Sequence, residues 1–151
     1  ADDERLLTIP YRRHRIVMFA RKDHRLAGRK SISLKDLDGE RMIVRETGST
    51  TRRNFESATR KAGVTPEVFM EIGSREAIRG AVIRGLGISY VSEAEFVPDP
   101  ELRQFAVRDA EIYTYAHVAV LAERQNSRII RAVLDIVRAS LKDANGKTAA
   151  P

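Results

Sequence analysis

The sequence predicts an α/β protein, because apolar β-rich runs and amphipathic helical segments alternate along the chain. Its 151 residues are 42% apolar and 32% charged, a composition typical of a globular protein with its own core. The chain contains no cysteine, which excludes a disulfide scaffold, a thiol nucleophile and thiolate metal sites, and agrees with a reducing cytoplasm. Its longest apolar runs are far shorter than the roughly twenty residues of a membrane-spanning helix. We therefore expect a cytoplasmic protein of one domain or two small lobes.

The first half of the chain predicts two strands and a helix. Residues 15–21 (RIVMFAR) are apolar throughout, which is typical of a strand buried on both faces. Ser33 is placed to cap a short helical turn, and residues 41–45 (RMIVR) form the next expected strand. A helix is expected at 51–62, with Gly63 at its end. Together these elements begin a strand–helix alternation.

The second half continues this alternation. A helix at 74–84 places four apolar residues on one face, and Gly85 ends it. Ser127 can cap a last helix that runs to Leu141. Further strands are expected at 67–72, 87–91, 102–107 and 113–122. Strands alternating with helices predict a parallel sheet, in which the loops after the strands gather at one edge and bind small ligands.

Two predicted strand-to-helix junctions carry the chemistry. Residues 45–52 (RETGSTTR) and 71–76 (EIGSRE) each place a glycine and a hydroxyl residue where a helix begins. The first turn of a helix has unpaired N–H groups and a partial positive charge, which suits a carboxylate, phosphonate, phosphate or sulfate. If the two strands are neighbours, one small anion can be held from two sides. The alternative is that these hydroxyls are plain helix caps.

The sequence offers little support for catalysis or for a nucleic-acid surface. The net charge of +6 is concentrated in residues 1–62, but the arginines are interleaved with acids and no nucleic-acid motif accompanies them. The histidines have no metal-ligand spacing, so we expect no metal and no cofactor. We expect three glutamates near the junctions to be solvated or paired rather than catalytic: Glu46, Glu71 and Glu76.

Two segments resemble the effector-binding domain of LysR-type transcriptional regulators. They are residues 15–53, which contain HRLA where the family usually has His-Pro, and residues 71–93 (EIGSREAIRGAVIRGLGISYVSE). The order and spacing of their motifs match the family over about residues 5–141. The SREAIRGAVIRGLG run is similar to a LysR group associated with aminoethylphosphonate use, and the RETGSTTR turn resembles regulators of carbon-fixation genes.

The resemblance implies a type II periplasmic-binding-protein-like fold of two lobes with a small effector between them. Residues 1–21 would form strand segments of the first lobe, 22–110 the second lobe and 111–141 the return to the first lobe, followed by a disordered tail at 142–151. The residues that the resemblance places at the effector site are Gly48, Ser49, Thr50, Thr51, Ser74 and Arg75.

The resemblance also implies a role without catalysis. The family's winged helix-turn-helix, which binds DNA, and the opening part of the first lobe have no counterpart in this chain. We therefore expect a small anionic effector and self-association into a dimer or tetramer, with DNA contacted only through the absent amino-terminal part. Two alternatives stay open, an extracytoplasmic solute-binding protein of the same fold and a small enzyme built on it.

Overall fold

The computed structural model describes residues 3–147 and separates the chain into two compact units. The larger unit spans His14–Thr114, and the smaller unit combines the residues before His14 with those after Thr114. The larger unit reaches beyond the expected limits of 22–110 because the buried residues 16–20 belong to its core. The assignment of the two units to effector lobes stays a prediction.

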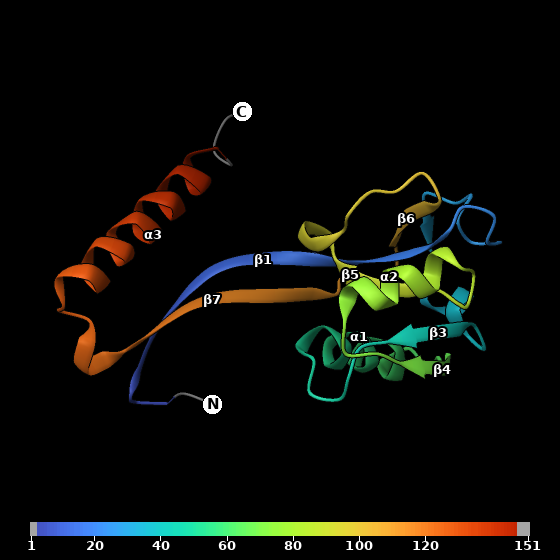
Figure 1. Cartoon of the computed structure of the whole chain (residues 1–151), viewed down its shortest axis with the longest axis horizontal. Helices are drawn as coiled ribbons and strands as arrows, with labels where there is room; N and C mark the ends of the chain where they lie inside the picture. The colour runs from blue at the N-terminus through green and yellow to red at the C-terminus, as the bar shows by residue number, and fades with distance from the viewer. Residues whose placement is uncertain (1–2, 148–151) are drawn as a thin grey trace. The chain divides into compact units, whose positions relative to one another are not determined.

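Strands and helices alternate through the described chain (Figure 1). The strands are β1 (Leu6–Arg21), β2 (Ser31–Ile32), β3 (Arg41–Val44), β4 (Glu67–Glu71), β5 (Ser89–Ser92), β6 (Leu102–Val107) and β7 (Tyr113–Leu121). The helices are α1 (Thr50–Lys61), α2 (Arg75–Ile83) and α3 (Arg128–Lys147), with 3₁₀ turns η1 (Leu34–Leu37), η2 (Glu93–Glu95) and η3 (Ala122–Arg124). The expected strands and helices are present near their expected ends. Strand β1 is longer than expected, and β2 was not foreseen.

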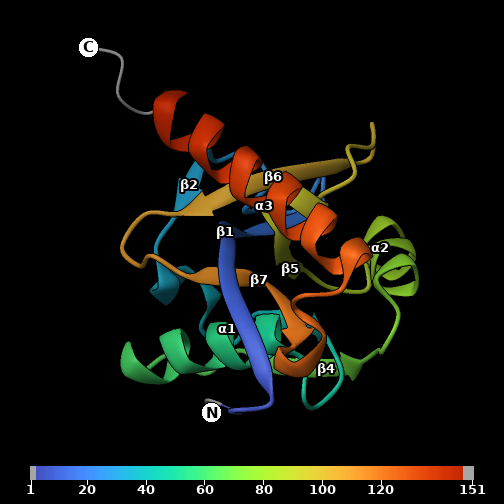
Figure 2. The ribbon, with the colours of Figure 1, turned by 90° about the vertical axis from the view of Figure 1, so that its left-hand side faces the viewer.

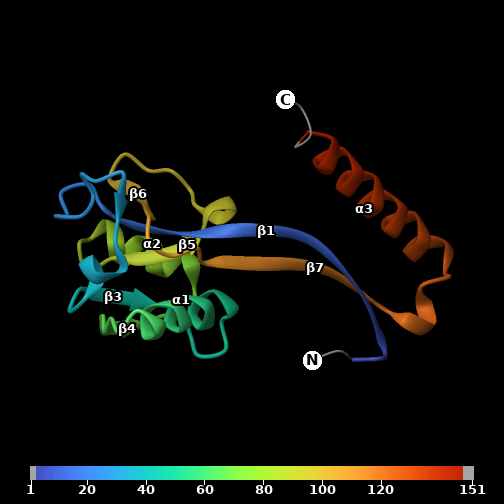
Figure 3. The same ribbon diagram turned by 180° about the vertical axis from the view of Figure 1, so that it is seen from behind.

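The larger unit contains a mixed sheet instead of the fully parallel sheet that the alternation predicted. Strand β1 pairs antiparallel with β5 and β6, and β2 runs parallel to β6 (Figure 2). Strands β3 and β4 form a separate parallel pair (Figures 1 and 3). The parallel expectation is therefore correct where α1 connects two neighbouring strands. It is wrong for β1, whose partners lie far along the chain.

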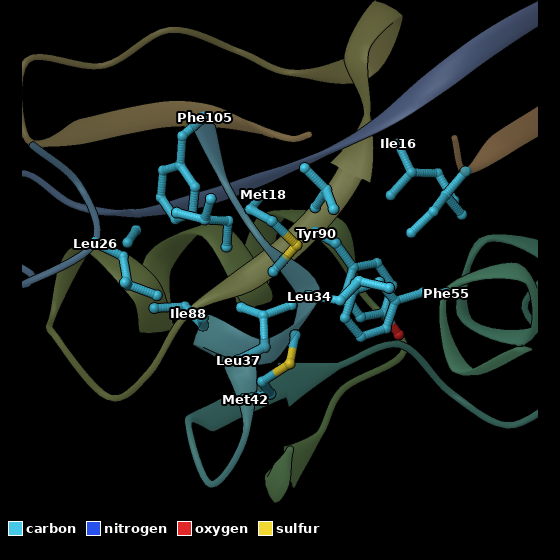
Figure 4. Packing of buried hydrophobic residues seen from close by; sticks show 14 of the residues in the cluster. Ile16, Met18, Leu26, Leu34, Leu37, Met42, Phe55, Ile88, Tyr90 and Phe105 are labelled. Carbon is cyan, nitrogen blue, oxygen red and sulfur yellow. The ribbon is translucent and has the colours of Figure 1, made fainter. Parts of the chain in front are cut away.

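Strand β1 buries side chains on both of its faces, as the apolar run at 15–21 predicts. Ile16 and Met18 belong to the main apolar cluster, whereas Phe19 belongs to a second cluster. Phe55 of α1 joins the main cluster (Figure 4), and α2 contributes to the second cluster. The two helices thus cover opposite faces of β1, and the start of each is fixed by its own core contacts.

The smaller unit contains the outer part of β1, most of β7 and α3. The Ala122 N–H donates to the Arg5 carbonyl at 2.8 Å, and Ser127 caps α3 by accepting the Ile130 N–H at 3.4 Å. Residues 142–147, expected to be disordered, lie within α3 instead. Residues 148–151 of the expected tail lie outside the described residues. None of the described helices combines the length and apolarity needed to cross a membrane.

Candidate functional site

The two strand-to-helix junctions lie at one edge of the β3–β4 pair. Strand β3 leads into α1 and β4 leads into α2. The two strands run in parallel, with Val44 opposite Glu71 at their carboxyl ends. Since parallel neighbours end at the same edge of a sheet, the starts of α1 and α2 both lie there. The structure thus meets the condition under which the sequence predicts one anion held from two sides.

Both junction serines act as helix caps. The Ser49 hydroxyl oxygen accepts a hydrogen bond from the Arg52 backbone N–H at 3.4 Å, and the Ser74 hydroxyl accepts one from the Ala77 N–H at 3.3 Å. The capping that the alternative predicts is therefore present, and a role of the two serines in ligand binding stays a prediction. The cap leaves each serine O–H free to donate to a further acceptor, because capping uses only a lone pair of the hydroxyl oxygen.

A small pocket, partly open to solvent, lies where the helix starts meet β5. Its lining residues are Phe19, Arg45, Thr51, Arg75, Ile78, Tyr90, Val91, Ser92 and Glu95. Two of the six expected site residues, Thr51 and Arg75, thus share one pocket, one from each helix start. The other four lie in the same junction segments outside its lining: Gly48, Ser49, Thr50 and Ser74.

A third strand, which the sequence did not lead us to expect here, contributes to this pocket. Tyr90 and Ser92 belong to β5, and Glu95 belongs to the η2 turn that follows it. Strand β5 reaches the same edge because Ile88, just before it, pairs in parallel with Met42 of β3. The junction after β5 consists of Ser92 followed by the short η2 turn. It carries no glycine, so it was not recognised as a site.

Two arginines of the pocket are held by neighbouring carboxylates. Arg45 makes two hydrogen bonds of 2.7 Å to the carboxylate of Glu46, and Arg75 pairs with Glu95 at 2.9 Å. The Arg45 guanidinium lowers the pKa of Glu46, because it stabilises the ionised carboxyl. The pocket lining therefore presents two permanent positive charges, each with an acidic partner that an incoming anion would have to replace or tolerate.

Arg52 ties the first turn of α1 to the end of β4. Its guanidinium contacts Glu56 at 2.6 Å and Glu71 at 2.5 Å, and also donates to the Arg45 carbonyl at 2.7 Å. The hydrogen bonds from Arg52 and from the Thr47 N–H hold the pKa of Glu71 below its usual range. Glu46 and Glu71 are thus both paired with arginine, as expected. A carboxyl that stays ionised in this way is a poor general acid.

The histidines and acids of the described residues form no metal site. No three such side chains between residues 3 and 147 are placed to hold a metal ion. His24 instead accepts the Leu26 N–H at 3.2 Å and lies 3.3 Å from Glu40, which stabilises its turn.

The family comparison covers nearly the whole chain. The model of the LysR substrate binding domain matches residues 1–142. The activator CmpR of Synechocystis sp. is 34% identical over 123 residues, which is 80% of this chain and 40% of CmpR. The RuBisCO operon transcriptional regulator of Allochromatium vinosum is also 34% identical, over 76% of this chain and 38% of that protein. The chain thus spans about two fifths of the length of these relatives, which are named as transcriptional regulators.

Solved structures agree with this comparison. The CcmR regulatory domain of Synechocystis PCC6803, solved in complex with 2-PG, is 34% identical with a TM-score of 0.78 over 89% of this chain and 66% of that one. A LysR-family regulator of Pseudomonas aeruginosa gives a TM-score of 0.78 at 26% identity over 93% of this chain and 50% of that one. These neighbours have the type II periplasmic-binding-protein-like fold that the resemblance implied. The chain belongs to the family of LysR substrate-binding domains.

Proposed function

We propose that this chain is the ligand-sensing part of a LysR-type transcriptional regulator and that its pocket binds a small anionic effector. The observation that carries the proposal is the convergence of the α1 and α2 starts on one pocket, lined by Thr51 and Arg75. Free N–H groups in the first turn of a helix favour anions, and two starts at one edge add their fields. Arg45, in the same lining, supplies a second guanidinium.

The effector class follows from these donors. Backbone N–H groups, serine and threonine hydroxyls and guanidinium groups all donate hydrogen bonds and favour negative charge. A carboxylate, phosphonate, phosphate or sulfate group suits this set of donors. The related CcmR regulatory domain was solved with 2-PG, which supports a small ligand in this family. Membership of the aminoethylphosphonate-associated group stays a prediction, while the RuBisCO operon relative agrees with the resemblance to carbon-fixation regulators.

The wider role is proposed from the relatives. They are named as regulators of the helix-turn-helix type, such as CmpR. In our proposal the unit at His14–Thr114 is the second effector lobe, and the ends of the chain belong to the first lobe. Effector binding then shifts a DNA-bound dimer or tetramer in the cytoplasm, and DNA is contacted by a winged helix-turn-helix and not by this chain. Our proposal assigns no catalytic role to Glu46 and Glu71, because both are engaged by arginines.

The site can be tested by removing one hydroxyl at each helix start. We expect inorganic phosphate to shift the backbone amide NMR signals of residues 49–52 and 74–77 in the unsubstituted chain. Ser49→Ala and Ser74→Ala should each weaken phosphate binding roughly threefold, because each serine holds the first turn of its helix, whose N–H groups are proposed to bind the anion. Ser127→Ala, which removes the cap of α3, is the matched control and should leave the affinity unchanged.

The outcomes separate binding from folding. A thermal unfolding curve of each variant shows whether a loss of folding stability alone explains its weaker phosphate binding. If phosphate, sulfate, methylphosphonate and acetate all leave the amide signals of both helix starts in place, the anion site is wrong. Equal weakening by all three serine substitutions would also contradict it, since Ser127 belongs to the other unit.

A further inference from the structure

Two arginines and two glutamates gather at the pocket. Arg45, Arg75 and Glu95 belong to its lining, and Glu46 lies directly beside Arg45. Each arginine already holds a carboxylate, since Arg45 is 2.7 Å from Glu46 and Arg75 is 2.9 Å from its own partner. The two positive and two negative charges cancel. The cluster therefore offers an incoming anion no net attraction while both ion pairs are intact.

The two ion pairs also act on one another. Hydrogen bonding to Glu46 raises the pKa of the Arg45 guanidinium, and the charge of Glu95 adds to this effect. Hydrogen bonding to Arg45 lowers the pKa of Glu46, and the charge of Arg75 adds to that effect. The four groups therefore form one electrostatic cluster, which joins the segments that follow β3, β4 and β5.

Glu95 is held less firmly than Glu46. Arg45 donates a hydrogen bond of 2.7 Å to each carboxylate oxygen of Glu46, a two-point contact that fixes both side chains. Glu95 lies on the three-residue η2 turn and contacts Arg75 at 2.9 Å between Oε1 and Nη2. The side chain of Arg75 is 54% exposed and that of Arg45 only 16%, so water weakens the Arg75–Glu95 pair more. This is the pair that an anion can open.

We propose that Glu95 is a built-in competitor of the effector: the bound anion displaces the Glu95 carboxylate and takes its place on the Arg75 guanidinium. The inference rests on the proposed function and adds to it the residue that limits the affinity of the site. A carboxylate and an oxyanion accept hydrogen bonds from the same N–H groups, so one excludes the other. The displaced Glu95 passes into water, which its exposed position on η2 permits.

The first test compares two glutamine variants by phosphate titration, followed by NMR of the amides of residues 74–77. We expect Glu95→Gln to bind inorganic phosphate about threefold more tightly than the unsubstituted chain, because a neutral amide competes for Arg75 less well than a carboxylate. Glu93→Gln is the matched control. It removes the same charge from the same turn, but Glu93 lies outside the pocket lining, so the affinity should not change. Both variants should keep the thermal midpoint of the unsubstituted chain, since both side chains are exposed.

A second pair of variants separates competition for Arg75 from simple repulsion of the anion. Arg75→Gln removes the guanidinium and should weaken phosphate binding. Adding Glu95→Gln to this variant should then have no further effect, because no guanidinium remains for which the carboxylate competes. An equal gain from Glu95→Gln with and without Arg75 would show that the charge of Glu95 acts on the anion directly, and would overturn the inference.

The outcomes distinguish this inference from the proposed function. If the unsubstituted chain and Glu95→Gln bind phosphate equally well, this inference alone is overturned. The same holds if Glu93→Gln gains as much affinity as Glu95→Gln. If neither the unsubstituted chain nor Glu95→Gln binds any oxyanion, the proposed function fails and this inference fails with it.

A direct measurement covers the case in which Arg75→Gln binds phosphate too weakly to be titrated. Glutamate labelled with ¹³C at its carboxyl carbon reports on the surroundings of each side chain. The signals of Glu95 and Glu93 are identified by their loss in the two glutamine variants. Phosphate should move the Glu95 signal of the unsubstituted chain and leave that of Glu93 in place. A still Glu95 signal, while the amides of residues 74–77 shift, would overturn the proposed displacement.

Discussion

The two compact units of this chain bury apolar side chains to very different degrees. Among the described residues, every buried apolar side chain except Leu134 belongs to the unit at His14–Thr114. In the other unit, α3 exposes Ile129 at 78% and Ile136 at 69%. Both units nevertheless carry the apolar periodicity that predicts an amphipathic helix. Periodicity therefore predicts which face of a helix is apolar, but not what that face packs against.

The proposed site lies in the unit that buries more apolar side chains. The pocket and both of its helix starts belong to the larger unit. Phe55 in α1 and Val82 in α2 each join an apolar cluster, so the helix starts are positioned by a packed core. A binding site needs such rigid support, because loosely held donors lose their alignment. We therefore expect the stability of the chain to be concentrated in the larger unit.

The largest effect should come from a matched pair of alanine substitutions, one in each unit. Phe105→Ala removes a side chain that is 2% exposed in the main cluster and should lower the free energy of unfolding by about 3–5 kcal/mol. Ile136→Ala removes a side chain that is 69% exposed and should change it by less than about 0.5 kcal/mol. Urea unfolding followed by circular dichroism measures both. Equal losses would show that α3 is as well packed as the sheet.

The same contrast explains which features of the fold were predictable. Gly63 and Gly85 have φ values of +67° and +73°, so the helix ends that the sequence predicted there follow from local backbone preference. The serine caps Ser49 and Ser74 are local in the same sense. Pairing of β1 with β5 joins segments more than sixty residues apart, as between Ile16 and Ser92, and no local signal specifies it. The all-parallel expectation failed for that reason.

In the candidate site, too, the features with local sequence signals were predictable and those that depend on strand pairing were not. Thr51 and Arg75 stand at helix starts, which the sequence marks by glycine and hydroxyl residues, and the pocket contains both. Tyr90 enters the pocket only because β5 lies beside β3, through the parallel pairing of Ile88 with Met42. A tyrosine in an apolar run looks like core in the sequence. Its place in the pocket lining becomes visible only when its surroundings are known.

A smaller effect should come from the close approach of two backbones inside the larger unit. A Cβ atom added at Gly87 would lie 2.6 Å from the Arg41 carbonyl oxygen, which accepts the Ile88 N–H at 3.0 Å. Gly87→Ala should therefore push β5 away from β3 and cost about 1–3 kcal/mol of unfolding free energy. Gly28→Ala is the matched control, since nothing lies within 4 Å of its added Cβ. Indistinguishable urea midpoints for the two variants would contradict tight packing at this contact.

The smallest expected effect is a change in the stability of the chain at low pH. Hydrogen bonds from Arg52 and the Thr47 N–H lower the pKa of Glu71 below its usual value near 4.5, so the folded chain binds this proton less readily than the unfolded chain. The resulting stabilisation is present above pH 4.5 and is lost as the pH falls below that value toward the folded-state pKa. Glu71→Gln should therefore lower the urea midpoint at pH 7 slightly and flatten its decrease between pH 5 and about pH 3.

Asp135→Asn provides the comparison in the smaller unit for that acid experiment. Asp135 pairs with Arg138 at 3.6 Å on the exposed surface of α3, with 73% of its side chain accessible. An exposed pair at this distance contributes little, because water screens it and its side chains stay free to move. Urea midpoints measured from pH 7 to about pH 3 should therefore follow the unsubstituted chain. The contrary outcome is that Asp135→Asn flattens the fall of the urea midpoint at low pH as much as Glu71→Gln does. The Arg52–Glu71 ion pair at the end of β4 would then contribute no more to stability than an exposed pair on α3, and the two units would not differ in the strength of their ion pairs.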